Sequence, residues 1–92
     1  MKCEASGIIT SASSPIIGTT SKGKDFEKIE YVIKTDDIYH KDLMFTVMSF
    51  DGPIEDAPRV GDHITVNFTV ESREYKGKWY TNATAYRITN KQ

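Results

Sequence analysis

The sequence predicts an all-β fold, and three features of it point that way. Apolar residues recur mostly at every second position, which is the period of a β-strand. No stretch carries the three-to-four-residue spacing of an amphipathic helix. Glycine, proline and Asp-rich turn signals separate the alternating segments. At 92 residues the chain has material for one core, so we expect a single domain over residues 1–92, ordered from about residue 2 to residue 89.

The first two strands are expected at residues 2–11 and 27–35. Ile8 and Ile9 lie at the centre of the first. In the second, Ile29, Tyr31 and Ile33 alternate on one face, which we assign to the core. The Ser/Thr/Gly-rich residues 11–24 between these strands predict a long loop with a short extended piece at residues 16–17.

Three further strands are expected at residues 42–50, 63–72 and 79–89. The fourth strand has the clearest alternation in the chain, with Ile64, Val66, Phe68 and Val70 directed inward. Gly77 supplies the positive φ that a hairpin turn over residues 75–78 needs. Trp79, which begins the fifth strand, is expected to plug one end of the core, and the alternative is that it faces the ligand and stacks on a base. Residues 51–61, with two prolines, have room for at most one helical turn.

Five alternating strands, a long first loop, a break after the third strand and a final hairpin describe a five-stranded OB-fold barrel. A small β-sandwich or an SH3-like barrel fits the same periodicity. Closure into a barrel is favoured because it removes the exposed edges that an open five-stranded sheet would leave.

The run Glu71-Ser72-Arg73-Glu74-Tyr75-Lys76-Gly77-Lys78-Trp79-Tyr80-Thr81 carries a resemblance to a known family. It resembles the most distinctive segment of a bacterial domain-of-unknown-function family with an OB fold, related to single-stranded-DNA-binding proteins. Further matches are Tyr31-Val32-Ile33-Lys34-Thr35, the turn Gly61-Asp62, and Ala85-Tyr86-Arg87-Ile88. The resemblance runs from about residue 7 to residue 88 and implies binding of single-stranded DNA. The family tends to carry tryptophan where Met48 and Tyr86 stand, and a basic residue where Thr84 stands.

The charge of the chain is nearly balanced, with a formal net charge of −1. Four acids fall between Asp51 and Asp62, whereas residues 22–34 and 71–88 each carry four bases. One part of the surface is therefore expected to be acidic and another mildly basic. A single cysteine excludes an internal disulfide, and without a signal peptide or an apolar run of membrane-spanning length we expect the protein in the cytosol.

Single-stranded nucleic acid is held by basic groups along the phosphates and by aromatic rings on which bases stack. The predicted stacking residues are Tyr80 and Tyr86, which share a face of the fifth strand, and Tyr75 near the hairpin tip. Tyr86 could instead be a half-buried strand residue. Met48, which faces outward from the third strand, could pack on a base or a sugar. The predicted phosphate contacts are Arg73, Lys76, Lys78, Lys28 and Lys34.

Catalysis has little support in the sequence, and we expect neither an enzyme nor a metal site nor a cofactor. No serine or cysteine nucleophile is placed beside His40 or His63. Asp36, Asp37, His40 and Asp42 are better explained as a solvated turn than as a cation site. The expected partner is single-stranded DNA, with RNA also possible, bound by a homodimer or a higher oligomer. The alternative is a protein-interaction module that uses an outward apolar strip of Val32, Met44, Met48 and Phe50.

Overall fold

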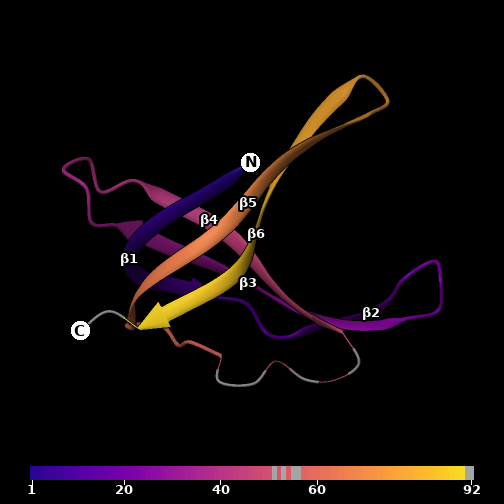
Figure 1. Cartoon of the computed structure of the whole chain (residues 1–92), viewed down its shortest axis with the longest axis horizontal. Helices are drawn as coiled ribbons and strands as arrows, with labels where there is room; N and C mark the ends of the chain where they lie inside the picture. Colours follow the sequence, from indigo (N-terminus) through magenta and orange to yellow (C-terminus); the bar gives the residue numbers. More distant parts are fainter. Residues whose placement is uncertain (51, 53, 55–56, 91–92) are drawn as a thin grey trace.

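The structure is a computed structural model that describes residues 1–50, 52, 54 and 57–90. Within these residues the regular secondary structure consists of β-strands (Figure 1). The strands are β1 (Lys2–Ala12), β2 (Ile16–Thr19), β3 (Asp25–Thr35), β4 (Asp42–Phe50), β5 (His63–Tyr75) and β6 (Lys78–Asn90). The described part of the chain includes no helix long and apolar enough to cross a membrane.

Five of the strands close into a ring. The sheet runs β1-β5-β6-β4-β3-β2, and an additional pairing of β1 with β3 joins its ends. Every pairing is antiparallel except that of β4 with β6, which meet in parallel at Thr46 and Thr84. This connectivity is that of the OB barrel, so the predicted fold class is confirmed. β2 lies outside the ring, on the same edge of β3 as β1, where it pairs with residues 25–28 that β1 leaves unpaired.

The barrel closes at β1, which pairs with two strands in turn. Its first part lies along β5 and its second part along β3, and Gly7 pairs with both. A Cβ atom on Gly7 would lie 2.3 Å from the backbone oxygen of Lys34. The register then shifts between Ile9 and Ser11, which marks a β-bulge. The absence of a side chain at residue 7 therefore allows the two edges of the sheet to meet.

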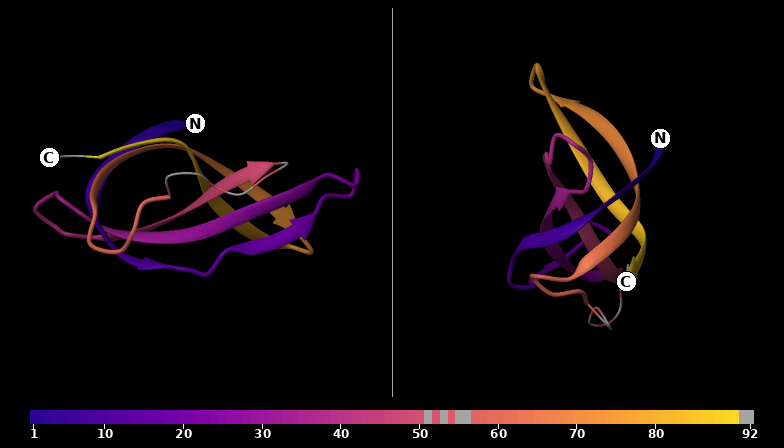
Figure 2. Two further views of the ribbon diagram at one scale, coloured as in Figure 1. Left: turned by 90° about the horizontal axis from the view of Figure 1, so that it is seen from below. Right: turned by 90° about the vertical axis from the view of Figure 1, so that its left-hand side faces the viewer.

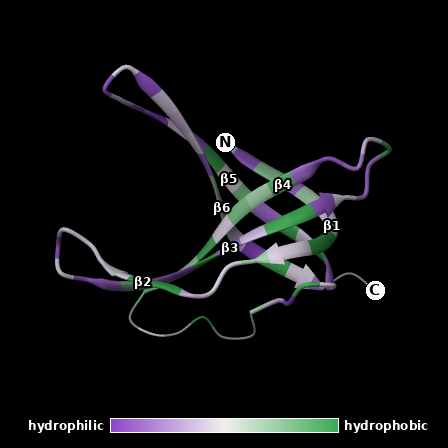
Figure 3. Cartoon of the chain, turned by 180° about the vertical axis from the view of Figure 1, so that it is seen from behind, coloured by the Kyte–Doolittle hydropathy of each residue, from purple (hydrophilic) through white to green (hydrophobic). Residues whose placement is uncertain are grey.

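The core follows the alternation seen in the sequence. Its buried side chains are Ile9, Ile29, Tyr31, Ile33, Phe45, Ile64, Val66 and Phe68. The inward assignments in β3 and at Ile64, Val66 and Phe68 in β5 are confirmed, and Val70 packs against the core while remaining partly exposed. Figure 3 shows hydrophobic residues concentrated in the strands of the ring, while the far end of the β5–β6 hairpin is mainly hydrophilic.

The prediction that Trp79 plugs the barrel is wrong. Trp79 is 68% exposed and pairs with Glu74 in the β5–β6 hairpin, beyond the last residues that pack on the core. Ile54 and Ala57, from the connection between β4 and β5, pack against the core instead. The Tyr31 hydroxyl also donates a 2.8 Å hydrogen bond to the Pro58 carbonyl oxygen. The described residues of this connection form no helical turn, and the remainder, residues 51, 53, 55 and 56, lies outside the described residues.

Two hairpins extend from the ring toward the same side in Figure 1 and in the left view of Figure 2. The β5–β6 arm (residues 71–82) turns at Lys76 and Gly77, which have φ values of 50° and 82°. Two successive positive φ values define a type I′ turn, so the expected hairpin is confirmed. The β2–β3 arm (residues 16–28) contains the short extended piece expected at residues 16–17, which runs to Thr19.

Candidate nucleic-acid interface

The outer surface of β3, β4 and β6 brings together several of the predicted binding residues. Since Ile29, Tyr31 and Phe45 point inward, the even-numbered residues of β3 and β4 point outward. Lys28 is paired with Met48, and Val32 with Met44, across these two strands. Thr46 meets Thr84 of β6 on the same side. We call this surface the outer strip.

One group of predicted residues lies on a single face of the β5–β6 arm. Arg73 pairs with Tyr80, and Tyr75 pairs with Lys78, so the four side chains alternate in charge and aromaticity across the hairpin. Together with Asn82, the side chains of Arg73, Tyr75 and Tyr80 line a shallow recess of about 390 Å³. Tyr75 and Tyr80 are 59% and 50% exposed, which leaves ring surface available for stacking.

Lys76 lies in the turn at the tip of this arm. Its Nζ atom is 5.4 Å from the centroid of the Tyr75 ring, within the range of a cation–π contact. An ammonium group held beside an aromatic ring is positioned to meet a phosphate whose base stacks on that ring. The arm therefore offers both kinds of contact that a single strand requires.

Tyr86 projects from a β-bulge in β6. Asn67 pairs with Arg87 and Phe68 pairs with Ala85, so Tyr86 is the extra residue between them. The bulge turns the side chains of Tyr86 and Arg87 outward in succession, and the inward position passes from Ala85 to Ile88. Tyr86 is 56% exposed, which leaves part of its ring surface accessible.

A second recess of about 390 Å³ lies where β4 and β6 diverge beyond their parallel contact. Its lining includes Met48, Tyr86 and Arg87, together with Ile54 and Pro58 of the β4–β5 connection. Two predicted residues therefore meet here. Arg87 was not among the predicted contacts, because a strict two-residue period places it on the same face as Ala85.

Lys2 is another basic residue that the sequence did not mark as a contact. Its Nζ atom lies 6.0 Å from the centroid of the Tyr86 ring, reaching across from β1. This neighbour depends on the pairing of β1 with β5, a long-range contact without a local sequence signal. Lys34, by contrast, is paired with Asp42 at the far end of the strip, apart from both recesses.

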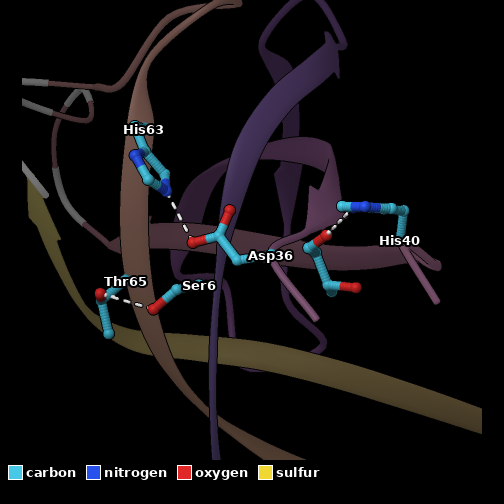
Figure 4. A network of polar contacts seen from close by, with 6 residues as sticks. Ser6, Asp36, His40, His63 and Thr65 are labelled. Atoms are coloured by element: carbon cyan, nitrogen blue, oxygen red, sulfur yellow. Dashed lines mark hydrogen bonds and ion pairs between the residues drawn. The ribbon is translucent and has the colours of Figure 1, made fainter. Parts of the chain in front are cut away.

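The histidines and the aspartates of the β3–β4 turn form a polar network (Figure 4). His63 Nε2 lies 2.7 Å from Asp36 Oδ2, and His40 Nδ1 lies 3.2 Å from the Thr35 carbonyl oxygen. The Ser6 hydroxyl is hydrogen-bonded to the Thr65 hydroxyl at 2.8 Å. Among residues 1–50, 52, 54 and 57–90, no group of three or more His, Cys, Asp or Glu side chains is arranged to hold a metal ion. The contact of His63 with Asp36 joins the turn to β5, and the backbone N–H of Asp36 donates a 2.9 Å hydrogen bond to the Ser6 carbonyl oxygen of β1. Asp37 accepts hydrogen bonds from the backbone N–H groups of Tyr39 and His40 within the turn.

The sequence of residues 4–89 matches the family described as Domain of unknown function (DUF3127). The chain is a member of this family. Among curated proteins, none matches the DUF3127 chain in sequence.

The DUF3127 chain is also similar to solved structures. One is a small single-stranded DNA-binding protein from Streptomyces coelicolor, with a TM-score of 0.54 and 15% identity over 99% of this chain and 94% of that one. Another is the dimeric N-terminal domain of PriB protein from Thermoanaerobacter tencongensis, with a TM-score of 0.59 and 12% identity over 99% and 96%. At such low identity these likenesses establish the shared fold.

Proposed function

We propose that this protein is a cytosolic, non-catalytic, single-domain module that binds single-stranded nucleic acid, DNA in the first place, with little sequence preference. The observation that carries the proposal is the set of exposed rings of Tyr75, Tyr80 and Tyr86, which lie beside basic side chains on the β5–β6 arm and on the outside of the barrel. Stacking on a tyrosine accepts any base, because every base has a π-face. Binding would therefore depend on the strand being single rather than on its sequence.

The shared fold supports this proposal. In OB barrels, oligonucleotides are bound on the face of the second and third barrel strands and on the two loops that flank it. In this chain those parts are the outer surface of β3 and β4, the β2–β3 arm and the β5–β6 arm. The Streptomyces coelicolor neighbour is itself a single-stranded DNA-binding protein.

We further propose that the chain acts as a homodimer or a higher oligomer. With a formal net charge of −1, one copy offers only a few phosphate contacts. Linking two copies makes the second binding event intramolecular and raises the overall affinity without any new contact. The PriB neighbour is described as dimeric, which is consistent with this proposal.

The direct test is fluorescence anisotropy with a labelled oligothymidine of about 20 nucleotides, a length that exceeds the site of most single OB folds. The same oligomer in duplex form is the comparison, both at low salt. We expect the single strand to bind at micromolar protein and the duplex to bind more weakly. Absence of single-strand binding at that concentration would rule out the proposal.

The contacts are tested by Tyr86→Ala and Lys78→Ala. We expect Tyr86→Ala to weaken binding by roughly five-fold or more, because stacking contributes about 1–3 kcal/mol per base. Matched controls are Tyr39→Ala and Lys41→Ala, since this exposed tyrosine and its neighbouring lysine lie in the β3–β4 turn, away from both recesses. Equal effects of the site variants and the controls would show that the assigned site is wrong.

The alternative function is protein interaction through the apolar residues of the outer strip. Met44, Met48 and Phe50 are exposed on one face of β4, and apolar side chains that share an exposed face can mark an interaction surface. This function predicts that Met44→Ser changes the oligomeric state in sedimentation, while oligothymidine remains unbound by the unmodified protein.

A further inference from the structure

Phe26 of the β2–β3 arm and Phe50 at the end of β4 are aromatic residues that lie outside the contacts assigned above. Phe26 and Phe50 are paired across β3 and β4, with ring centroids 6.5 Å apart and ring planes tilted by 59°. The Nζ atom of Lys24 lies 5.7 Å from the centroid of the Phe50 ring. We call these three residues the Phe50 cluster. Phe50 keeps about half of its surface exposed, so its ring is accessible to a ligand.

Gly18 of β2 leaves the space that the ring of Phe26 occupies. Gly18 pairs with Phe26, and a Cβ atom at Gly18 would lie 2.6 Å from the Cζ atom of the Phe26 ring. The absence of a side chain on β2 therefore allows the Phe26 ring to lie over this strand. Phe26 in turn packs beside Phe50, which gives Phe50 a preformed support.

In this arm, basic and acidic side chains lie on opposite sides of β3. Phe26 and Lys28 lie on the outer side of β3, and the contact with Phe50 brings Lys24 to that side. The two acids between them, Asp25 and Glu27, lie on the opposite side of the strand. There Asp25 accepts a 3.0 Å hydrogen bond from the Thr19 hydroxyl, and Glu27 accepts one of 3.0 Å from the backbone N–H of Ile54. Among the described residues, the outer side of the arm therefore carries Lys24, Lys28 and the rings of Phe26 and Phe50.

The cluster continues the outer strip. Phe50 is two residues beyond Met48 on the same face of β4. From the contact between Thr46 and Thr84, β4 leads to Phe50 in one direction and β6 leads back to Tyr80 in the other. At about 3.3 Å per residue each path covers about 13 Å, so the two aromatic groups are roughly 25–30 Å apart along the surface.

We propose that the Phe50 cluster is a second stacking station for the same single strand, at the opposite end of the outer strip from Tyr75 and Tyr80. Phe50 provides the ring, and Lys28 contacts a flanking phosphate. This inference rests on the proposed function and extends it, because it assigns both arms to one continuous path. A strand must then be long enough to reach both stations before it gains the full affinity.

The test compares oligothymidines of about 4 and about 20 nucleotides, the shorter being near the smallest OB-fold site. In the unmodified protein the longer strand binds more tightly. We expect Phe50→Ala to weaken binding of the longer strand by roughly five-fold or more and to remove most of the gain with length. Phe50→Leu, which keeps apolar bulk but loses the ring, should do the same. Ile17→Ala is the matched control, because Ile17 is an exposed apolar residue on the other face of this arm.

If the unmodified protein binds the longer strand but Phe50→Ala behaves like Ile17→Ala, the second station is ruled out and the proposed function stands. If the unmodified protein binds no oligothymidine, the proposed function itself fails. A change of the protein from dimer to monomer in sedimentation of Phe50→Leu without DNA would place Phe50 in a subunit interface and would also overturn the inference.

Fluorescence of a tryptophan placed in the Phe50 cluster would report base stacking directly, without a comparison of affinities. Trp79 is the only tryptophan of the chain, so Phe50→Trp in a Trp79→Phe background places a single fluorophore at the cluster. Stacking of a base on this ring should quench its fluorescence when the longer strand is added. Unchanged fluorescence at a saturating concentration of a bound strand would contradict the proposal.

Discussion

At the scale of single residues, the position that most constrains the barrel is one that lacks a side chain. Gly7 lies where β1 is paired on both edges, and the backbone of Lys34 occupies the space that a Cβ atom would need. The obstruction is backbone rather than a flexible side chain. A methyl group at residue 7 could avoid this clash only if β1 and β3 moved apart. We therefore expect it to lower the stability of the fold.

Gly7→Ala should lower the free energy of unfolding by about 1–3 kcal/mol or more, the range found for overpacking in a close-packed interior. Urea denaturation monitored by circular dichroism gives this value. Ser11→Ala, an exposed position in the same strand, should change stability by less than about 0.5 kcal/mol. A Gly7→Ala variant as stable as the unmodified protein would show that β1 does not close the ring so tightly.

Tyr31 gives the chain a pH dependence in the alkaline range. Burial raises the pKa of its phenol above the ordinary value of 10.0, and the negative charge of Asp62 raises it further. The folded state therefore keeps its proton at pH values where the unfolded chain has lost it. The contribution to stability is complete below pH 10 and is lost as the pH rises through the folded-state pKa.

Tyr31→Phe should therefore lose less stability than the unmodified protein between pH 9 and pH 11, although it begins about 1 kcal/mol less stable without the hydrogen bond to Pro58. Urea unfolding at several pH values measures the difference. Tyr75→Phe, at an exposed position, is the control and should follow the unmodified protein. Parallel curves for all three would contradict the prediction.

At the scale of strands and hairpins, the sequence correctly predicted which side chains are buried wherever apolar and polar residues alternate regularly. Ile64, Val66 and Phe68 follow the two-residue period without interruption, and all three are buried. The same rule fails at Arg87, because a bulge adds one residue to β6 and leaves no mark in the composition. Trp79 was misplaced for another reason. A large apolar side chain favours burial, but the paired strands continue beyond the barrel and carry this residue with them.

A substitution in the turn of the β5–β6 arm can change the binding of oligothymidine without lowering the stability of the fold. Lys76 adopts a positive φ that costs a lysine conformational energy, whereas Asn-Gly is strongly preferred in type I′ turns. We expect Lys76→Asn to keep or raise the melting temperature while weakening oligothymidine binding, because it removes the ammonium group beside Tyr75.

Thermal melts and anisotropy on the same preparation test this pair of outcomes. Lys22→Asn, a lysine near the tip of the β2–β3 arm whose φ is not positive, is the control for loss of charge and should not raise the melting temperature. If Lys76→Asn left the affinity unchanged, the tip of the β5–β6 arm would not be part of the contact surface.

At the scale of the whole molecule, binding has to be achieved without an excess of positive charge. A formal net charge of −1 provides no general attraction to nucleic acid, so the phosphate contacts must come from a few placed side chains. Most of the acids that the sequence places between residues 51 and 62 lie outside the described residues, so the predicted acidic region stays a prediction.

The salt dependence of binding should accordingly be shallow. Two or three phosphates neutralised per copy correspond to a slope of about −1.4 to −2.1 in a plot of log affinity against log salt concentration. Anisotropy titrations over a range of sodium chloride concentrations measure this slope. A slope of roughly twice that size would mean that four to six basic side chains contact phosphates at once, and would contradict the expected shallow dependence.

The sequence could predict that the sheet closes, but not how far the two arms extend beyond it. The strand period identifies a core face wherever apolar residues alternate, and that was sufficient for the fold. Contacts such as Lys2 with Tyr86 or Lys24 with Phe50 join strands distant in the chain, and their positions follow only from the register of the closed ring.

Tyr80 and Trp79 lie on opposite faces of the β5–β6 arm, and this arrangement limits which insertions in the hairpin evolution can accept. Insertions here would leave the core intact, so relatives should differ in the length of this hairpin more readily than in the ring. Adding one codon to each strand between Asn82 and the barrel would rotate Tyr80 to the side where Trp79 now lies. Length changes that preserve the tyrosine face should therefore arrive as two codons per strand.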